Sequence, residues 1–360
     1  MDGFDSLPEQ DEAKRLLRSA LSEGPAHAYL FHGPAGVGKR RAALAFAGEL
    51  LGDAPRVERK IHPDLYLLEP VGDQIRIDDI RSLRRDLHMR PFEADRRVYL
   101  LFSAETMNED AADALLKDLE EPPPYVVVVL VADELGPLPE TIRSRCQLVP
   151  FRRLSERAVR AAIADRAPGL APDEVTALAR VAAGRIDRAE RLLDAEAVDR
   201  RQRLLQTARS VYLDADFDPG AAADAILQSM RERGDDAQTD AEEECEPLGL
   251  PPKETEQRVK RARRGAERDE LLASLDELAA WYRDLLVVAA GAESTVIHFD
   301  RLAELTDDAS RERMLGAERA AEAVRASWRS FEEFNISPGL ALEALFVHLR
   351  RELASPALAA

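Results

Sequence analysis

The sequence predicts an α/β domain followed by two all-helical regions, and three observations predict this fold class. Short apolar runs recur through the first 153 residues, and such runs suit strands that are buried on both faces of a parallel sheet. Helical patterns lie between these runs, which is typical of βαβ units. From Leu154 onward the strand-like runs stop and helical spacing continues to the end.

The elements of the α/β domain follow from apolar runs and their flanking residues. Strands are predicted at 28–31, 98–102 and 126–131, where β-branched, aromatic and other apolar residues are continuous. Helices are predicted at 40–51 and 110–119. The first strand ends at a glycine-rich turn that opens the first of these helices.

The helical regions carry their own boundary signals. Ser155 is a predicted N-cap, because a serine hydroxyl can accept a hydrogen bond from the first turn, and Pro172 opens the next helix. A last helix is expected to begin at Ser337 with Pro338 in its first turn. The sequence therefore predicts three domains, at residues 1–153, 154–205 and 206–360.

The segment 231–268 stands out within the last domain. It is dense in charge, with an acidic cluster at 242–244, a basic cluster at 260–264, and glycine and proline between them. We expect a solvated, partly disordered insertion. A DNA-binding strip made from the basic cluster is the alternative reading.

Composition limits the function. The formal net charge is −18, which opposes autonomous wrapping of a polyanion such as DNA. No apolar run is long enough to cross a membrane, and the acidic start lacks the features of a signal peptide. Two cysteines, Cys146 and Cys245, are too few for a disulfide framework or a zinc site. We expect a cytoplasmic protein without a metal.

The segment 33–40 has the pattern of a phosphate-binding loop. Gly33, Gly36 and Gly38 allow backbone N–H groups to turn inward, and Lys39 could reach terminal phosphates. The position after this lysine should carry Ser or Thr to bind magnesium, but it is Arg40, which has only donors.

A second defect concerns the strand at 98–102. An ATPase needs a carboxylate at the end of this strand, yet Phe102 and Ser103 occupy the place, and Glu105 lies too far along. Hydrolysis by this chain is therefore not expected. Passive binding of ATP or ADP through Lys39 stays open.

Several blocks resemble bacterial clamp-loader subunits of the AAA+ family in residue type, order and spacing. They are the segments 27–31, 33–39, 62–64, 77–81, 114–123 and 138–146, with a weaker likeness at 335–338. The resemblance implies an AAA+ P-loop domain, a helical lid and a helical collar that oligomerises. Because both nucleotide motifs are degraded, the chain resembles the delta-prime type more than the ATP-hydrolysing gamma or tau type.

The delta-prime likeness implies a stator subunit of the DNA polymerase III clamp loader. Such a subunit belongs to a DNA-directed DNA polymerase holoenzyme but carries no polymerase site. Its implied partners are gamma/tau-type ATPase subunits and a delta-type subunit, with the sliding clamp and primer-template DNA reached through the complex, and no membrane. The collar stripes around Trp281 and Leu345 are expected to pack against other subunits. Helix arginines Arg76, Arg81, Arg84 and Arg85 are candidates for DNA contact, and a solvated helix face is the alternative.

In that family the arginine of a Ser-Arg-Cys block acts on the nucleotide of a neighbouring subunit. Here Ser144 and Arg145 match this block. A guanidinium supplied in trans stabilises charge on the transferring phosphoryl group. The plain alternative is that Arg145 only forms an ion pair at the end of a helix.

Two further departures from the family are visible in the sequence. The expected sensor arginine is replaced by Asp187, with Arg185 nearby. The four-cysteine zinc module of many members is missing, so no zinc is predicted and His62 should make a structural hydrogen bond. Two rival functions remain open: an ATP-hydrolysing gamma/tau-type subunit, and a P-loop adaptor outside replication.

Overall fold

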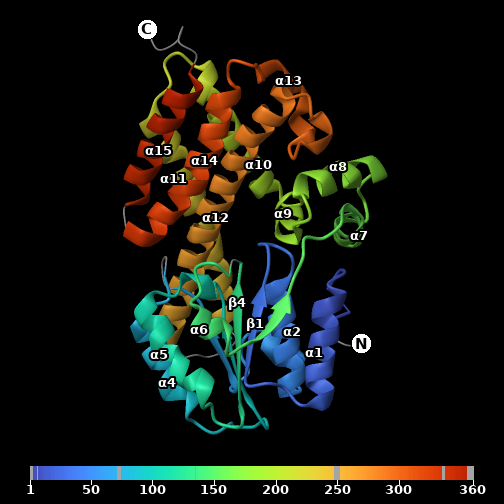
Figure 1. Cartoon of the computed structure of the whole chain (residues 1–360), viewed down its shortest axis with the longest axis vertical. Coiled ribbons are helices and arrows are strands. Elements are labelled where there is room, and N and C mark those ends of the chain that lie inside the picture. The colour runs from blue at the N-terminus through green and yellow to red at the C-terminus, as the bar shows by residue number, and fades with distance from the viewer. Residues whose placement is uncertain are drawn as a thin grey trace. The chain divides into compact units, whose positions relative to one another are not determined.

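The computed structural model describes residues 3–5, 7–70, 74–133, 135–246, 252–334 and 337–354 (Figure 1). The chain divides into two compact units. Unit 1 comprises the residues up to Pro70 together with Gln74–Val175 and Ala182–Glu190, and unit 2 comprises Thr176–Val181 and the residues from Arg191 onward. The three domains with boundaries after residues 153 and 205 remain a prediction.

Unit 1 is built on a five-stranded sheet with the order β2-β3-β4-β1-β5, and every pairing is parallel. The strands are β1 (Ala28–His32), β2 (Leu65–Leu68), β3 (Arg97–Leu101), β4 (Val126–Ala132) and β5 (Gln147–Pro150). Leu30 pairs with Leu130 across β1 and β4. All residues of β3 and β4 are buried, which explains their continuous apolar sequence. The predicted parallel sheet is confirmed.

Helices cover both faces of this sheet (Figure 1). On one face α1 (Asp11–Glu23) and α2 (Lys39–Leu51) pack through Leu17 and Phe46. On the other face α4 (Ile77–Leu87) and α5 (Glu109–Glu120) pack through Leu83 and Leu115. The short helices α3 (Ala54–Glu58), η1 (Ala104–Thr106) and α6 (Glu140–Arg143) lie in the connections. The carboxyl ends of the strands therefore meet at one edge of a buried sheet, where ligands of open α/β folds bind.

Three helices follow the sheet: α7 (Glu156–Arg166), α8 (Pro172–Ala182) and α9 (Ile186–Arg191). The hydroxyl of Ser155 accepts the N–H of Ala158 at 3.2 Å, as predicted for an N-cap. Gly184 has a φ of +80°, and a Cβ there would lie 2.7 Å from the carbonyl oxygen of Leu154. The chain can therefore make this turn only with glycine.

Unit 2 is helical among its described residues. Its helices are α10 (Ala195–Leu213), α11 (Pro219–Cys245), α12 (Pro252–Ala289), α13 (Leu302–Asp308), α14 (Met314–Phe334) and α15 (Pro338–Leu353), with short 3-10 turns η3 (Glu293–Thr295) and η4 (Phe299–Arg301). Trp281 and Leu345 lie in the core that these helices share. This chain's own helices bury both side chains, so these two residues belong to its core. Contact of the surrounding stripes with other subunits stays a prediction.

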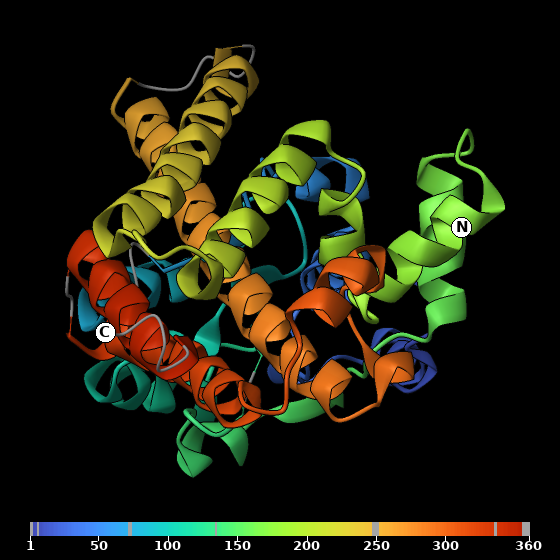
Figure 2. The same cartoon turned by 90° about the horizontal axis from the view of Figure 1, so that it is seen from above.

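The charged segment 231–268 also differs from the prediction. Residues 231–245 belong to α11, residue 246 follows that helix, and residues 252–268 belong to α12. The two helices lie side by side (Figure 2). Arg263 on α12 forms an ion pair with Asp235 on α11 at 2.9 Å and donates to Gln238 at 2.8 Å. The linear sequence shows these charges but not their pairing across two helices, so the segment resembles a solvated loop there. The expected disorder is therefore wrong for these residues. Residues 247–251 lie outside the described part.

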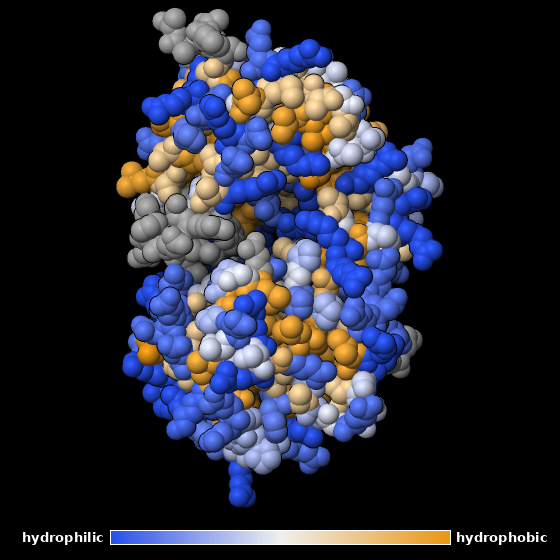
Figure 3. Space-filling model, in the orientation of Figure 1, coloured by the Kyte–Doolittle hydropathy of each residue, from blue (hydrophilic) through white to orange (hydrophobic). Residues whose placement is uncertain are grey.

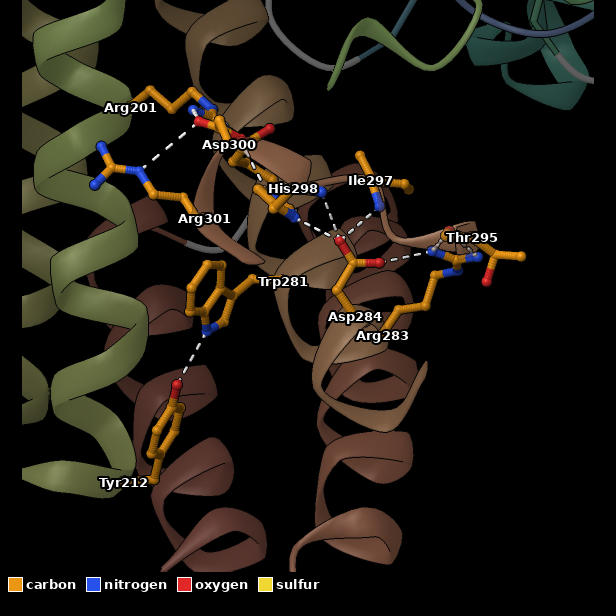
Figure 4. Close-up of polar contacts among 11 residues, drawn as sticks. Arg201, Tyr212, Trp281, Arg283, Asp284, Thr295, Ile297, His298, Asp300 and Arg301 are labelled. Atoms are coloured by element: carbon orange, nitrogen blue, oxygen red, sulfur yellow. Dashed lines mark hydrogen bonds and ion pairs between the residues drawn. The ribbon is translucent and has the colours of Figure 1, made fainter. Parts of the chain in front are cut away.

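A buried polar network joins the loop at 295–301 to α12 (Figure 4). The carboxylate of Asp284, which is fully buried, accepts the backbone N–H groups of Ile297 and His298 at 2.9 and 2.8 Å. One ring nitrogen of His298 lies 2.8 Å from Asp284, and the other lies 3.1 Å from Glu277. On the same helix Trp281 donates its indole N–H to the hydroxyl of Tyr212 at 3.2 Å. Satisfied polar networks of this kind specify one arrangement of the elements they join.

The surface is mixed in hydropathy, with hydrophilic residues spread widely over the face drawn in Figure 3. In the described part of the chain, no helix combines the length and apolar character needed to cross a membrane.

Candidate functional site

The glycine-rich loop lies between β1 and α2, at the carboxyl edge of the sheet. Gly33, Gly36 and Gly38 have φ values of +138°, +71° and +98°, which residues with a Cβ rarely adopt. A Cβ on Gly33 would lie 2.1 Å from the carbonyl oxygen of Phe151. The predicted order of strand, loop and helix is therefore present, and backbone geometry fixes these glycines.

The ammonium group of Lys39 is engaged by this chain itself. Its Nζ donates to the carbonyl oxygens of Gly33 and Pro34, both at 2.5 Å, and lies 2.7 Å from Oδ1 of Asp133. An ammonium has three N–H donors, and these three contacts account for all of them. Burial, and then the charge of Lys39, lowers the pKa of the nearby His32. The lysine that could reach a phosphate is thus paired with a carboxylate of this chain.

A second carboxylate lies against the loop. The N–H of Ile186 donates to the carbonyl oxygen of Gly36 at 2.7 Å, which brings α9 to the loop. A Cβ on Gly36 would lie only 1.7 Å from Oδ1 of Asp187. Arg185 donates to the other oxygen of this carboxylate at 2.7 Å. The residue at the expected sensor position is therefore an acid that repels phosphate, and its arginine partner is already paired.

Arg40 occupies the place where a magnesium-binding hydroxyl is expected. Its Nη1 lies 2.8 Å from Glu69, and its guanidinium carbon lies 4.1 Å from the ring centre of Phe102. Phe102, at the end of β3, is buried, so the strand end carries an aromatic ring instead of a carboxylate. Glu105 accepts the backbone N–H of Asp133 at 3.2 Å. At the two positions where an ATPase carries its magnesium ligands, Arg40 offers only N–H donors and Phe102 has no side-chain oxygen.

Arg145 lies just after α6 and is bound on one side. Its Nε donates to Oε1 of Glu120 at 2.8 Å, its Nη2 contacts the same oxygen, and its Nη1 donates to the carbonyl oxygen of Thr141 at 2.9 Å. The hydroxyl of Ser144 donates to that carbonyl at 3.1 Å. The ion pair that sequence reasoning gave as the plain alternative therefore exists. The Arg145 side chain is nevertheless 32% exposed.

The structure separates Arg145 from the loop. Lys39 and Arg40 have their described partners at the carboxyl edge of the sheet, whereas Arg145 has its partners on α5 and α6. Sequence reasoning missed two contributors to the loop, the acid Asp133 and the position of Asp187 above Gly36. The signal for Asp133 was its place directly after a buried strand.

The remaining candidates have structural roles. Nδ1 of His62 accepts the N–H of Asp64 at 3.1 Å, which confirms the predicted structural hydrogen bond. Burial raises the pKa of the Cys146 thiol to about 12, which leaves it unreactive at neutral pH. Within the ranges that the structure describes, no group of three or more His, Cys, Asp or Glu residues could hold a metal ion.

Three of the four helix arginines considered for DNA contact have partners close by. Arg81 pairs with Asp78 at 3.0 Å, Arg84 pairs with the buried Asp118 at 2.6 Å, and Arg85 donates to Ser82 at 2.9 Å. These contacts favour a structural role for this helix face.

The sheet and the glycine-rich loop define a class of protein: a P-loop α/β domain whose phosphate-binding groups are paired with its own side chains. Residues 9–155 match the family described as DNA polymerase III, delta subunit. The chain is 35% identical to DNA polymerase III subunit delta′ of Bacillus subtilis over 158 residues, which cover 41% of this chain and 48% of that protein. Over this N-terminal part the chain is therefore similar to delta-prime-type clamp-loader subunits.

Two further relatives each match part of this chain. DNA polymerase III subunit delta′ of Pseudomonas aeruginosa is 40% identical over 34% of this chain and 42% of its own length. DNA polymerase III subunit tau of Bacillus subtilis is 29% identical over 43% of this chain and 30% of its own. The matches thus span about half, or less, of the length of these relatives.

Proposed function

We propose that the chain is a non-hydrolysing stator subunit of a DNA polymerase III clamp loader, which supplies Arg145 to the ATP site of a neighbouring subunit. The observation that carries this proposal is the contrast between two basic groups. Lys39 is 4% exposed and paired with Asp133, whereas Arg145 keeps about a third of its surface in water. The group that would serve this chain is closed off, and the group that would serve a neighbour is accessible.

The chemistry of the proposed role is electrostatic. In phosphoryl transfer, charge spreads over the equatorial oxygens of the transferring group, and a guanidinium offered from another subunit stabilises that charge. Arginine suits this role because its planar fork stays protonated and binds two oxygens at once. Ser144, which donates to the same carbonyl oxygen as Arg145, would help to fix the turn that carries it.

The other parts of the proposal come from the relatives. The delta-prime and tau proteins that match are subunits of DNA polymerase III. By analogy the partners of this chain are gamma/tau-type ATPase subunits and a delta-type subunit, and the complex loads a sliding clamp onto primed DNA. Residues 154–205 would form a lid and residues 206–360 a collar that oligomerises. The net charge of −18 supports DNA contact through the complex, not by this chain alone.

The test is the ATPase rate of a clamp loader reconstituted with this chain, clamp and primed DNA. With Arg145→Ala we expect the turnover number to fall at least about tenfold while the complex still assembles, since fingers contribute about 10³ to 10⁵ in rate. Arg152→Ala is the matched control, because that side chain is more exposed, at 82%, and forms a surface ion pair with Glu12.

Each other outcome points to a rival. An unchanged rate in an intact complex would remove the finger and leave a scaffold. Hydrolysis by the isolated chain, abolished by Lys39→Ala, would favour a gamma/tau-type ATPase. Failure to assemble with clamp-loader subunits would favour an adaptor outside replication.

A further inference from the structure

We infer that Glu120 is the positioning residue of Arg145: it holds the side edge of the guanidinium and leaves the end edge to bind anionic oxygen acceptors, those of the terminal phosphate of a neighbour's nucleotide. This inference rests on the proposed function and adds to it a second residue and a geometry.

The contacts of Arg145 divide its guanidinium into two edges. The Nε–H and one N–H of Nη2 form the side edge, and both meet Oε1 of Glu120. One N–H of Nη1 is donated to the carbonyl oxygen of Thr141 at 2.9 Å. An arginine has five N–H donors. The other N–H of Nη1 makes a long contact with Oγ of Ser144 at 3.4 Å, and one N–H of Nη2 remains among the described contacts. Together these two N–H groups form the end edge of the fork, which can bind two oxygens of one phosphate when the long contact to Ser144 is given up.

The position of Glu120 is set by the end of α5. This helix begins at Asn108, whose side chain accepts the N–H of Ala111 at 2.9 Å, and it ends at Glu120. Two prolines, Pro122 and Pro123, follow directly, and proline disfavours a helical residue before it. The helix therefore stops where its last side chain meets Arg145.

A carboxylate at this place is unfavourable for the helix itself. The C-terminal end of a helix carries partial negative charge, which repels an acidic side chain there. Glu120 and Glu121 both stand at this end of α5. The guanidinium of Arg145 offsets the unfavourable charge of Glu120 by forming an ion pair with it. Glu121 has no comparable ion pair among the described contacts. The pairing thus explains an acid that helix propensity does not.

Fixing one edge would matter for catalysis in the neighbouring site. A long arginine side chain on a surface samples many rotamers, and holding it in the reactive orientation removes part of that entropic cost from the barrier. Because Glu120 is about half exposed, at 49%, water screens the charge of the pair. Glu120 therefore acts by orienting the side chain of Arg145, and its own charge weakens the positive charge of Arg145 little.

The experiment uses the reconstituted clamp loader with clamp and primed DNA. Glu120→Ala should lower the turnover number for ATP about three- to tenfold and change KM less than about twofold, because orientation acts on the transition state. Glu120→Gln, whose amide oxygen can still accept both N–H groups, should restore the rate to within about twofold of wild type. Glu121→Ala is the matched control one residue away, and it should leave the rate unchanged.

A double substitution separates positioning from simple structural damage. If Glu120 acts through Arg145, Glu120→Ala added to Arg145→Ala should cause no further loss, since residues that act as one unit are not additive. Equal losses with Glu120→Ala and Glu120→Gln, or an additional loss in the double variant, would overturn the inference.

The failure of this inference differs from failure of the proposed function. A fall in rate with Arg145→Ala but none with Glu120→Ala would leave the finger in place and remove Glu120 from its control. No change with either variant would remove the finger itself, and the inference with it.

Discussion

Asp64 is a buried acid that organises a loop of unit 1. Its carboxylate accepts the backbone N–H groups of Phe92, Glu93 and Ala94 at 2.6, 2.9 and 2.9 Å, and the side chain lies among the fully buried residues. Burial alone raises the pKa of Asp64, but the three backbone N–H groups outweigh it, and the pKa lies below the usual value. The ionised form is therefore the one that the fold requires.

This pKa shift predicts how stability depends on pH. A carboxyl whose pKa is lower in the folded than in the unfolded state stabilises the fold above its unfolded pKa of about 3.9. That stability is lost as pH falls from there through the lower folded value. Asp64→Asn should destabilise unit 1 by about 1–3 kcal/mol at pH 7, because an amide nitrogen replaces one acceptor. It should also flatten the loss of stability as the pH falls below about 4.

The measurement is urea unfolding followed by far-ultraviolet circular dichroism at several pH values. Asp113→Asn is the control, since that exposed side chain on α5 lies in the same unit. Equal pH dependence of Asp64→Asn and the wild-type chain would contradict the prediction.

At the same scale, the sequence identified the substitutions in the nucleotide loop but not their partners. Arg40 and Phe102 depart from a simple pattern, so they are visible in the linear chain. Asp133 and Asp187 lie about 94 and 148 positions beyond Lys39. Their approach depends on the pairing of β4 with β1 and on the turn at Gly184, and neither is contained in local spacing.

Two helical glycines of unit 2 offer a test of packing between elements. A Cβ on Gly316 in α14 would lie 2.2 Å from the carbonyl oxygen of Glu352 in α15, whereas a Cβ on Gly265 in α12 would meet nothing within 4 Å. Alanine favours a helix over glycine by about 1 kcal/mol. Gly265→Ala should therefore stabilise unit 2, and Gly316→Ala should destabilise it by about 1–3 kcal/mol because backbone must move.

Chemical unfolding of the two variants and the wild-type chain gives the comparison. Since both substitutions add the same methyl group, opposite signs isolate the contact between α14 and α15. Stabilisation by Gly316→Ala would show that the two helices pack less closely than the distances indicate.

Strands with a marked apolar run could be predicted from the sequence, and the two edge strands were missed. The predicted strands at 28–31, 98–102 and 126–131 match β1, β3 and β4 closely, since each is an apolar run buried on both faces. The sequence analysis missed β2 and β5. These two strands form the edges of the sheet, are only partly buried and have four residues each, so neither gives a long apolar run.

For the whole molecule, the paired groups around Lys39 predict weak response to nucleotide. A ligand that binds only the folded chain stabilises it according to its concentration relative to Kd. At 1 mM Mg-ATP or Mg-ADP we expect a change in Tm below about 2 °C, which corresponds to a Kd no tighter than about 1 mM. Differential scanning fluorimetry measures this directly. A rise of several degrees that disappears in Lys39→Ala would show that nucleotide displaces Asp133.

The position of Trp281 has a consequence for spectroscopy. Both tryptophans of the chain, at positions 281 and 328, belong to unit 2. Trp281 is fully buried, with its indole N–H on the hydroxyl of Tyr212. Intrinsic tryptophan emission therefore follows unit 2 alone, whereas the circular dichroism signal of the helices follows both units. Following both signals in one denaturant titration will show whether the two units unfold together. Coincident midpoints are expected if unit 1, which carries Arg145, and unit 2 unfold in one cooperative transition, and separate midpoints if each unit unfolds by itself.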